Sequence, residues 1–240
     1  MSAVPKTAMV LAAGLGTRMR PITDRVPKPL VEIAGQTLLD HALDRLALAG
    51  VERVVVNVHY KADMVIARLA SRDRPHIEIS HEDDLLETGG GVARALPLLG
   101  EWFFVVNSDV LWLDGKDYAL ARLAAAFDPA RMDAVLLLQR TVTAVGYDGS
   151  GDYFLDPLGT PRRRREREVA PFLFAGLQVL HRRVFDGIAE PRFSLNRIYD
   201  RAEEAGRLHA IVHEGEWFHI GTPEGLAATR DRLSSHRIER

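Results

Sequence analysis

The segment MVLAAGLGTRMRPITDRVPKP, residues 9–29, constrains the fold more than any other part of this sequence. Its first four residues are apolar and predict a buried strand. The strand runs directly into a loop with Gly14, Gly16, four basic side chains and three prolines. A glycine turn at the carboxyl end of a strand can point successive NH groups at one anion, and Arg18 and Lys28 can neutralise it. The loop therefore predicts a polyphosphate ligand.

Two common phosphate-binding motifs do not fit this loop. The dinucleotide fingerprint G-x-G-x-x-G needs a third small residue where this chain has Met19. The P-loop motif G-x-x-x-x-G-K-[ST] needs a spacing that neither glycine provides. A G-x-G pair alone is more typical of an ordinary surface loop whose arginines are solvated, so other parts of the sequence must decide.

Composition and charge limit the class of protein. The 240 residues are 47% hydrophobic, which suits one large domain, and we expect a single domain over 1–240. With 31 basic and 33 acidic residues, the formal charge is -2, so the chain lacks the basic field of nucleic-acid binders. Zero cysteines exclude disulfides, thiolate metal sites and a cysteine nucleophile. No apolar run approaches the roughly 18 residues of a membrane span, and the start is unlike a signal peptide. We expect a cytoplasmic protein with no nucleic-acid or membrane partner; its oligomeric state stays open.

The first half of the chain alternates helix and strand patterns. Expected helices cover 38–50, 61–70 and 90–99, and expected strands cover 53–58, 77–80 and 102–107. This order predicts an α/β fold with a doubly wound, mostly parallel sheet. Ligands bind such sheets outside the carboxyl ends of the strands. The glycine loop, Asn57, His59 and the motif NSD at 107–109 all fall there.

The second half loses this alternation. Strand patterns at 134–140 and 172–180 flank a polar stretch at 146–167, which predicts strands and hairpins added at one side of the sheet. Ser194 is expected to cap a helix over 195–205, and a strand is expected over 208–212. Thr222 and Pro223 are typical of a helix start.

Taken whole, GLGTRMRPITDRVPKP resembles the signature of sugar-1-phosphate nucleotidylyltransferases. The matching residues are LAAG at 11–14, Gly16, Thr17, Arg18, Pro21, Thr23, Pro27 and Lys28. The resemblance implies a Rossmann-like enzyme that transfers a nucleotidyl group from a nucleoside triphosphate to a sugar 1-phosphate and releases pyrophosphate. It implies a triphosphate-binding loop made of Leu11, Ala12, Ala13, Gly14, Gly16, Thr17 and Arg18. It also implies that Arg18 holds the departing pyrophosphate and that Lys28 bridges the phosphates of both substrates.

Within this family, LAAG, ETGGG and ALPLLG are most similar to N-acetylmuramate α-1-phosphate uridylyltransferases, which serve peptidoglycan recycling. Mannose-1-phosphate guanylyltransferase is the alternative substrate assignment. A non-catalytic regulatory protein that binds nucleotide sugars is the alternative of another class, although intact Arg18, Lys28 and Asp109 argue against it. We expect a nucleotide-binding part at about 1–115, a sugar-binding part at about 116–222 and a last helix at about 223–235.

The segment HEDDLLETGGG predicts the nucleobase site. Three glycines that open a helix let a flat ring approach the backbone, and the NH groups of a first helical turn are unpaired within the helix. The resemblance implies that Thr88 and Gly89 contact the base and ribose, that Asn107 contacts the nucleotide and that Glu82 reads the base edge. A carboxylate only accepts hydrogen bonds, which suits uracil or guanine.

The resemblance also implies a metal site and a sugar pocket. Asp109 occupies the position of the family's metal aspartate, and its hard oxygens suit Mg²⁺, with Mn²⁺ as an alternative. His219 stands where many relatives have a second acidic or amide ligand, and it binds metal, binds phosphate or fills space. Gly176 and Asn196 are expected at the sugar. The run RRRRERE at 162–168 predicts a solvated hairpin, without the lysine by which many relatives hold the sugar phosphate.

Overall fold

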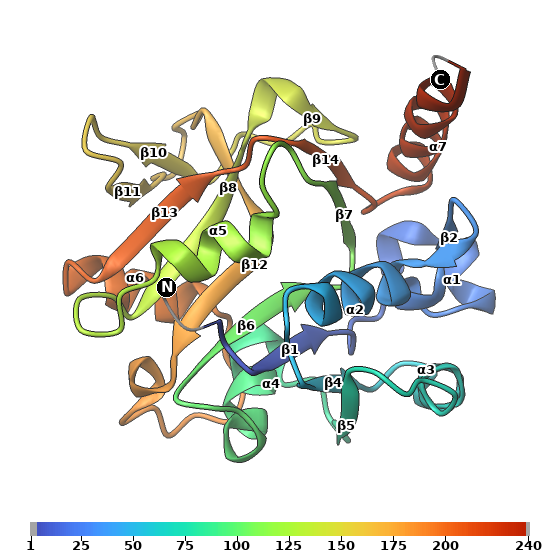
Figure 1. Ribbon diagram of the computed structural model, residues 1–240, viewed down its shortest axis with the longest axis horizontal. Helices are drawn as coiled ribbons and strands as arrows, with labels where there is room; N and C mark the ends of the chain where they lie inside the picture. The colour runs from blue at the N-terminus through green and yellow to red at the C-terminus, as the bar shows by residue number, and fades with distance from the viewer. Residues whose placement is uncertain (1–3, 239–240) are drawn as a thin grey trace.

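The structure, a computed structural model, describes residues 4–238 and arranges them around a nine-stranded sheet (Figure 1). Four neighbouring strands that form one end of this sheet are parallel, in the order β6-β1-β4-β5. They are β1 (Thr7–Leu11), β4 (Arg53–Val58), β5 (His76–His81) and β6 (Trp102–Asn107). Continuous apolar runs suit strands that are covered on both faces. The predicted α/β fold with a parallel core is confirmed.

The second half of the chain extends this sheet with antiparallel strands, so the whole sheet is mixed. β12 (Phe172–His181) lies antiparallel to β6 and to β8 (Ala134–Arg140). β13 (Leu208–Val212) is parallel to β8. The hairpin of β10 (Tyr153–Leu155) and β11 (Pro161–Arg163) follows beside β12. The predicted addition of strands and a hairpin is confirmed.

A separate three-stranded sheet was not predicted. Its strands are β7 (Val110–Leu113), β14 (Glu216–His219) and β9 (Ala144–Val145). β7 begins directly after Asp109, and β14 runs antiparallel to it with His219 opposite Val110. The last part of the chain therefore returns to the end of β6. A short hairpin of β2 (Glu32–Ile33) and β3 (Gln36–Thr37) leads into the helix after it.

Helices cover both faces of the large sheet. They are α1 (Ile22–Arg25), α2 (Leu38–Leu48), α3 (Ala62–Leu69), α4 (Glu87–Ala95), α5 (Ala119–Ala126), α6 (Asn196–Glu204) and α7 (Pro223–Ile238). Side chains alternate along a strand. Val54 and Val56 of β4 therefore pack with α2, α3 and α5, while Val55 packs in the core that contains α4 and α6. This is the doubly wound arrangement that the sequence predicted.

Some helix boundaries differ from the prediction. α4 begins at Glu87 and ends at Ala95, because Pro97 continues the chain as a 3₁₀ turn over Leu96–Leu98. α5 was not predicted at all. The expected caps are present: the NH of Asn196 donates to Ser194 Oγ at 3.2 Å, and the NH of Gly225 donates to Thr222 Oγ1 at 3.1 Å.

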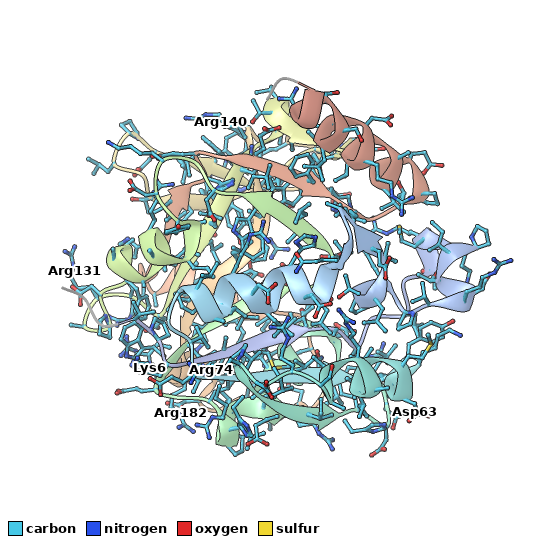
Figure 2. The ribbon with its side chains drawn as sticks, turned by 45° about the vertical axis from the view of Figure 1, so that its right-hand side comes forward. Lys6, Asp63, Arg74, Arg131, Arg140 and Arg182 are labelled. Carbon is cyan, nitrogen blue, oxygen red and sulfur yellow. The ribbon has the colours of Figure 1, made fainter. Side chains whose placement is uncertain are left out.

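Charged side chains lie at separate places around the outline of the molecule (Figure 2). Those marked there are Lys6, Asp63, Arg74, Arg131, Arg140 and Arg182. Within residues 4–238, no helix combines the length and the apolar character that crossing a bilayer requires.

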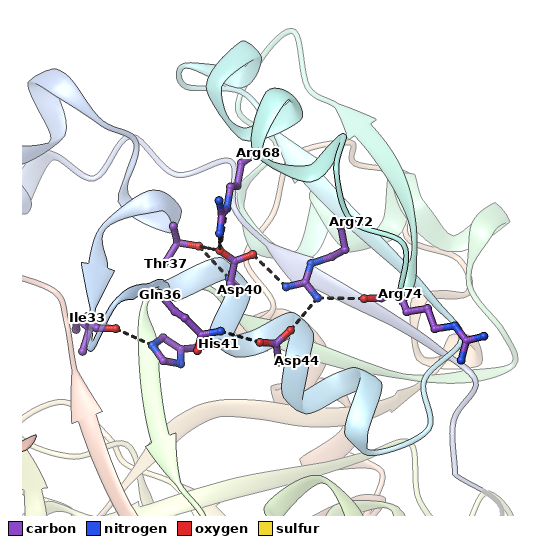
Figure 3. A network of polar contacts seen from close by, with 9 residues as sticks. All are labelled: Ile33, Gln36, Thr37, Asp40, His41, Asp44, Arg68, Arg72 and Arg74. Carbon is purple, nitrogen blue, oxygen red and sulfur yellow. Dashed lines mark hydrogen bonds and ion pairs between the residues drawn. The ribbon is translucent and has the colours of Figure 1, made fainter. Parts of the chain in front are cut away.

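A buried aspartate ties α2 to α3 (Figure 3). Asp40 is 5% exposed, and its Oδ2 accepts hydrogen bonds from Thr37 Oγ1 at 2.6 Å and from Arg68 Nε at 2.9 Å. Its Oδ1 accepts from Arg72 Nη2 at 3.0 Å, and Arg72 also pairs with Asp44 at 2.9 Å. Burial alone would raise the pKa of Asp40, but the hydroxyl and the two guanidinium groups together hold it below its ordinary value.

Replacing Asp40 by Asn should lower the free energy of unfolding at pH 7 by about 1–3 kcal/mol, because charged hydrogen bonds are lost at a buried site. The pKa of Asp40 is lower in the folded protein, so this stabilisation is present above the unfolded pKa, near 3.8, and is lost as pH falls through the folded pKa. The stability deficit of Asp40→Asn, measured by urea unfolding, should therefore shrink on acidification.

Asp44→Asn is the matched control on the same helix. The Asp44 side chain is 44% exposed and pairs with the same Arg72, so its replacement should cost less than about 1 kcal/mol. Equal losses from the two variants would contradict the assignment of Asp40 as the tie between α2 and α3.

Candidate active site

A pocket lies at the carboxyl edge of the parallel strands. Its lining comes from the loop after β1, the end of β4, the segment between β5 and α4, and the turn after β6. The lining residues are Leu11, Ala12, Ala13, Gly14, Lys28, Pro29, Asn57, Glu82, Leu85, Glu87, Thr88, Asn107, Ser108 and Asp109. Most of the predicted site residues are therefore brought together. Gly16, Thr17, Arg18, Gly89, Gly176, Asn196 and His219 are outside this lining.

The glycine loop presents unpaired backbone donors. Within the described part of the chain, the NH groups from Gly14 to Arg18 make no hydrogen bond. Gly16 has a left-handed φ of 62°, and a Cβ there would lie 2.9 Å from Thr23 Cγ2. Thr23 Oγ1 donates to the Gly16 carbonyl at 2.8 Å and holds the turn closed. A run of unpaired NH groups in a glycine turn is a geometry that binds anions.

Lys28 and Asp109 form an ion pair in the pocket. Lys28 Nζ lies 2.9 Å from Asp109 Oδ2, and the side chains are 12% and 31% exposed. Burial acts to raise the pKa of Asp109, but Lys28, with smaller contributions from His219 and Arg18, holds it below its ordinary value. Asp109 is therefore a carboxylate at neutral pH. Arg18 is exposed and makes no hydrogen bond or ion pair with another described residue.

The donors around Asp109 fit a magnesium ion that is shared with phosphates. The Asp109 carboxylate offers hard oxygens in the pocket, and the nearby ammonium shows that a cation is accommodated beside it. Residues 4–238 contain no group of three or more acidic or imidazole side chains that could hold a metal ion by themselves. The protein would therefore supply one carboxylate, and water and substrate oxygens would complete the coordination.

His219 lies beside this site, although it is not in the pocket lining. The NH of Ile220 donates to the Asp109 carbonyl at 3.2 Å, which fixes β14 against the turn after β6. The His219 ring stacks on Trp217 with centroids 5.9 Å apart and meets the edge of Tyr147 at 6.3 Å. Burial, only partly offset by Asp109, lowers the pKa of His219, so its imidazole is neutral at pH 7. Its role as a metal ligand stays a prediction.

Two of the three glycines of α4 serve a purpose that the sequence did not reveal. The NH groups of Gly89 and Gly90 donate to the Phe193 carbonyl at 2.8 and 3.0 Å. A Cβ at Gly89 would collide with the Phe193 ring, and one at Gly90 would collide with the Pro191 carbonyl. These two NH groups are therefore not free to donate to a nucleobase, and the contact of Gly89 with the base and ribose that the resemblance implies stays a prediction. Gly89 and Gly90 admit the segment before α6.

Two other residues expected at the base already have protein partners. Glu82 is 1% exposed, and its two oxygens accept from Asn57 Nδ2 at 2.7 Å and from the Leu86 NH at 3.0 Å. Thr88 Oγ1 accepts from the Leu195 NH at 2.9 Å. Both residues still line the pocket, so contacts with a base stay a prediction for them.

The two residues expected at the sugar are outside the pocket lining. Gly176, at φ 80°, packs behind the pocket, where a Cβ would lie 3.1 Å from Asn107 Cβ. Asn196 is exposed at the start of α6. Only Arg162 and Arg163 of the arginine run lie in the β10–β11 hairpin. The run is also less solvated than expected, because Arg162 pairs with Glu168 at 2.9 Å and Arg163 with Asp200 at 2.6 Å. Sugar contacts stay a prediction.

Sequence reasoning did not assign Asn57, Pro29, Leu85, Glu87 or Ser108 to the site. Ser108 could have been predicted, because it is the middle residue of the NSD motif. In the structure its hydroxyl donates to the Leu11 carbonyl at 2.6 Å. Asn57 was expected at the same rim from its place at the end of a strand, but nothing in the sequence revealed its partners.

Two known proteins resemble the chain along most of its length. N-acetylmuramate alpha-1-phosphate uridylyltransferase of Caulobacter vibrioides is 45% identical over 240 residues, which cover 98% of this chain and 99% of that protein. The protein of the same name from Neisseria meningitidis serogroup B is 34% identical and covers 90% of this chain and 93% of its own length.

A solved structure and a family model agree with these relatives. The structure of UDP-glucose pyrophosphorylase complexed with UDP-glucose aligns with a TM-score of 0.76 over 98% of this chain and all of that one. Its sequence identity is 17%, so it supports the fold alone. Residues 8–143 match the model of the MobA-like NTP transferase domain, which is more than half of the chain. The chain therefore belongs to the MobA-like NTP transferase family, as the nucleotidylyltransferase signature of its glycine loop predicted.

Proposed function

We propose that the protein transfers a uridylyl group from UTP to N-acetylmuramate α-1-phosphate, giving the UDP-sugar and pyrophosphate in the recycling of cell-wall sugars. The observation that carries this proposal is one pocket in which Gly14, the start of the run of unpaired NH groups, lies together with Lys28 and Asp109. The substrate pair comes from the two full-length relatives. A cytoplasmic location remains part of the proposal.

Catalysis in this proposal depends on placement and on charge. An oxygen of the sugar phosphate forms a bond to the α-phosphorus while the bond from that phosphorus to the pyrophosphate oxygen breaks, in line and without a protein nucleophile. The NH groups from Gly14 to Arg18 hold the triphosphate. The Arg18 guanidinium stabilises the leaving pyrophosphate, and the Lys28 ammonium stabilises charge between the two substrates.

Asp109 would hold Mg²⁺ in this proposal, with Mn²⁺ as an alternative ion. When bound, the ion neutralises charge on the phosphates that it shares with the protein. Because Lys28 now donates to the same carboxylate, its ammonium must exchange part of that contact for phosphate oxygens when substrates bind. The pair thus positions the lysine next to the reacting phosphates.

The two substrates are proposed to occupy different parts of one domain. Residues up to about 115 would bind the nucleotide, with Thr88 and Asn107 next to its base and ribose. Residues from about 116 to 222 would bind the sugar, with Gly176 behind the pocket and Asn196 at the start of α6. The last helix, α7, is assigned to neither part in this division.

The test of the proposal is pyrophosphate release with a panel of nucleoside triphosphates and sugar 1-phosphates. UTP with N-acetylmuramate α-1-phosphate should give the highest kcat/KM. GTP with mannose 1-phosphate as the best pair would establish the guanylyltransferase alternative instead. Binding of nucleotide sugars without turnover of any pair would favour the regulatory protein. Lys28→Met, assayed in parallel, should show no release and so exclude a contaminating enzyme.

A metal role for His219 predicts a change in ion preference. If the neutral imidazole is a ligand, His219→Asp replaces nitrogen by oxygen and should shift the ratio of Mg²⁺-supported to Mn²⁺-supported activity about tenfold toward Mg²⁺. His219→Asn, which supplies a neutral oxygen, is the control for charge. Initial rates at a series of concentrations of each ion measure the ratio. Ratios that are equal in all three proteins would remove His219 from the metal site.

A further inference from the structure

Two polar side chains are buried directly beneath the pocket. Asn57, at the fifth position of β4, is 3% exposed, and Glu82, which follows β5, is 1% exposed. The residues directly before and after Asn57 on β4, Val56 and Val58, belong to the hydrophobic core. A buried amide and carboxylate cost desolvation energy that an apolar pair would not cost, so their hydrogen bonds must compensate for it.

These hydrogen bonds form a continuous relay between two loops. Asn57 Oδ1 accepts from the Ala12 NH at 2.7 Å, and Asn57 Nδ2 donates to Glu82 Oε1 at 2.7 Å. Glu82 Oε2 in turn accepts from the Leu86 NH at 3.0 Å. Ala12 is the first residue of the glycine loop, and Leu86 precedes α4. The relay therefore joins the loop that would hold the triphosphate to the segment that lines the base side of the pocket.

The surroundings leave this relay little freedom. His59 Nδ1 donates to the Glu82 carbonyl at 2.8 Å and fixes the main chain of the same residue. A Cβ at Gly91 would lie 2.8 Å from Glu82 Oε1 and 2.9 Å from Asn57 Nδ2, so α4 packs directly on the pair. Three elements, β4, the β5 end and α4, thus meet at two side chains.

We propose that Asn57 is a positioning residue that, through Glu82, sets the distance and angle between the glycine loop and the base-side segment. This proposal rests on the proposed function, because it assumes that one nucleotide spans both loops. Asn57 acts through the Ala12 NH, and Glu82 acts through the Leu86 NH. Glu82 selects the base by placing this segment, and its carboxylate does not itself bind the base.

The relay can be tested by exchanging the amide and the carboxylate between positions 57 and 82. Asn57→Asp keeps the acceptor for Ala12 but replaces the donor to Glu82 by an oxygen, so two carboxylate oxygens face each other. Adding Glu82→Gln to that variant supplies an amide donor for the new carboxylate and keeps an acceptor for Leu86. The double variant therefore rebuilds the relay with the same net charge.

The readouts are UTP affinity by calorimetry, kcat and KM for UTP, and the thermal midpoint. Asn57→Asp should lower kcat/KM by about 100-fold, because a loop displaced by about 1 Å misplaces the reacting phosphates. The double variant should recover a kcat/KM within about tenfold of the wild-type value, since the side chains at positions 57 and 82 are coupled. Asp40→Asn, which is outside the pocket lining, is the control for lost stability and should leave UTP affinity unchanged.

Two results would overturn the proposal. The first is a kcat/KM of Asn57→Asp within about twofold of the wild-type value. Such a change is smaller than the loss of one buried hydrogen bond would cause. The second is a kcat/KM of the double variant that is no higher than that of Asn57→Asp. This result is expected if the Glu82 carboxylate binds the base directly. A wild-type protein that binds UTP but turns over no sugar phosphate would refute the proposed function, while the calorimetric comparison would still test the relay.

Discussion

The parallel pairing of β1 with β4 and β6 is the constraint on which the site depends. Its register places Leu11 next to Asn57 on one side and next to Asn107 on the other. Because parallel strands end at the same edge, strand pairing alone brings the glycine loop, the Asn57 amide and the turn to Asp109 together there. A slip of one residue would turn each of these side chains to the opposite face of the sheet. The ion pair of Lys28 and Asp109 then closes the site across the loop.

Much of this arrangement could be predicted from the sequence, because it follows from local patterns. The apolar runs Arg53–Val58 and Trp102–Asn107 were predicted at their observed bounds. The rim was predictable because strand ends in a parallel sheet converge. The small sheet of β7, β9 and β14 was not predictable, since β14 pairs with β7 about 100 residues away and with β9 about 70 residues away. The neighbourhood of His219 and Asp109 depends on that pairing.

Glycines show where such reasoning must fail. The sequence around Gly14 and the sequence around Gly89 are both compatible with a ligand site. Neither sequence shows which atoms face the glycine in the folded protein. Gly89 faces the Phe193 ring, so its missing side chain makes room for protein. Gly14 lines the pocket and has no protein atom within 4 Å of the position of a Cβ, so its missing side chain leaves room for a ligand. Only the packing distinguishes the two uses.

The affinity of Gly14→Ala for UTP in the presence of Mg²⁺, measured by calorimetry, tests most directly whether the glycine loop holds the triphosphate. A Cβ at this position meets no protein atom and needs no left-handed backbone, so the thermal midpoint should match that of wild type. The added methyl group should nonetheless keep phosphate away from the NH groups and raise the Kd by at least about tenfold, or 1.4 kcal/mol. An unchanged Kd in a protein with an unchanged thermal midpoint would contradict this account.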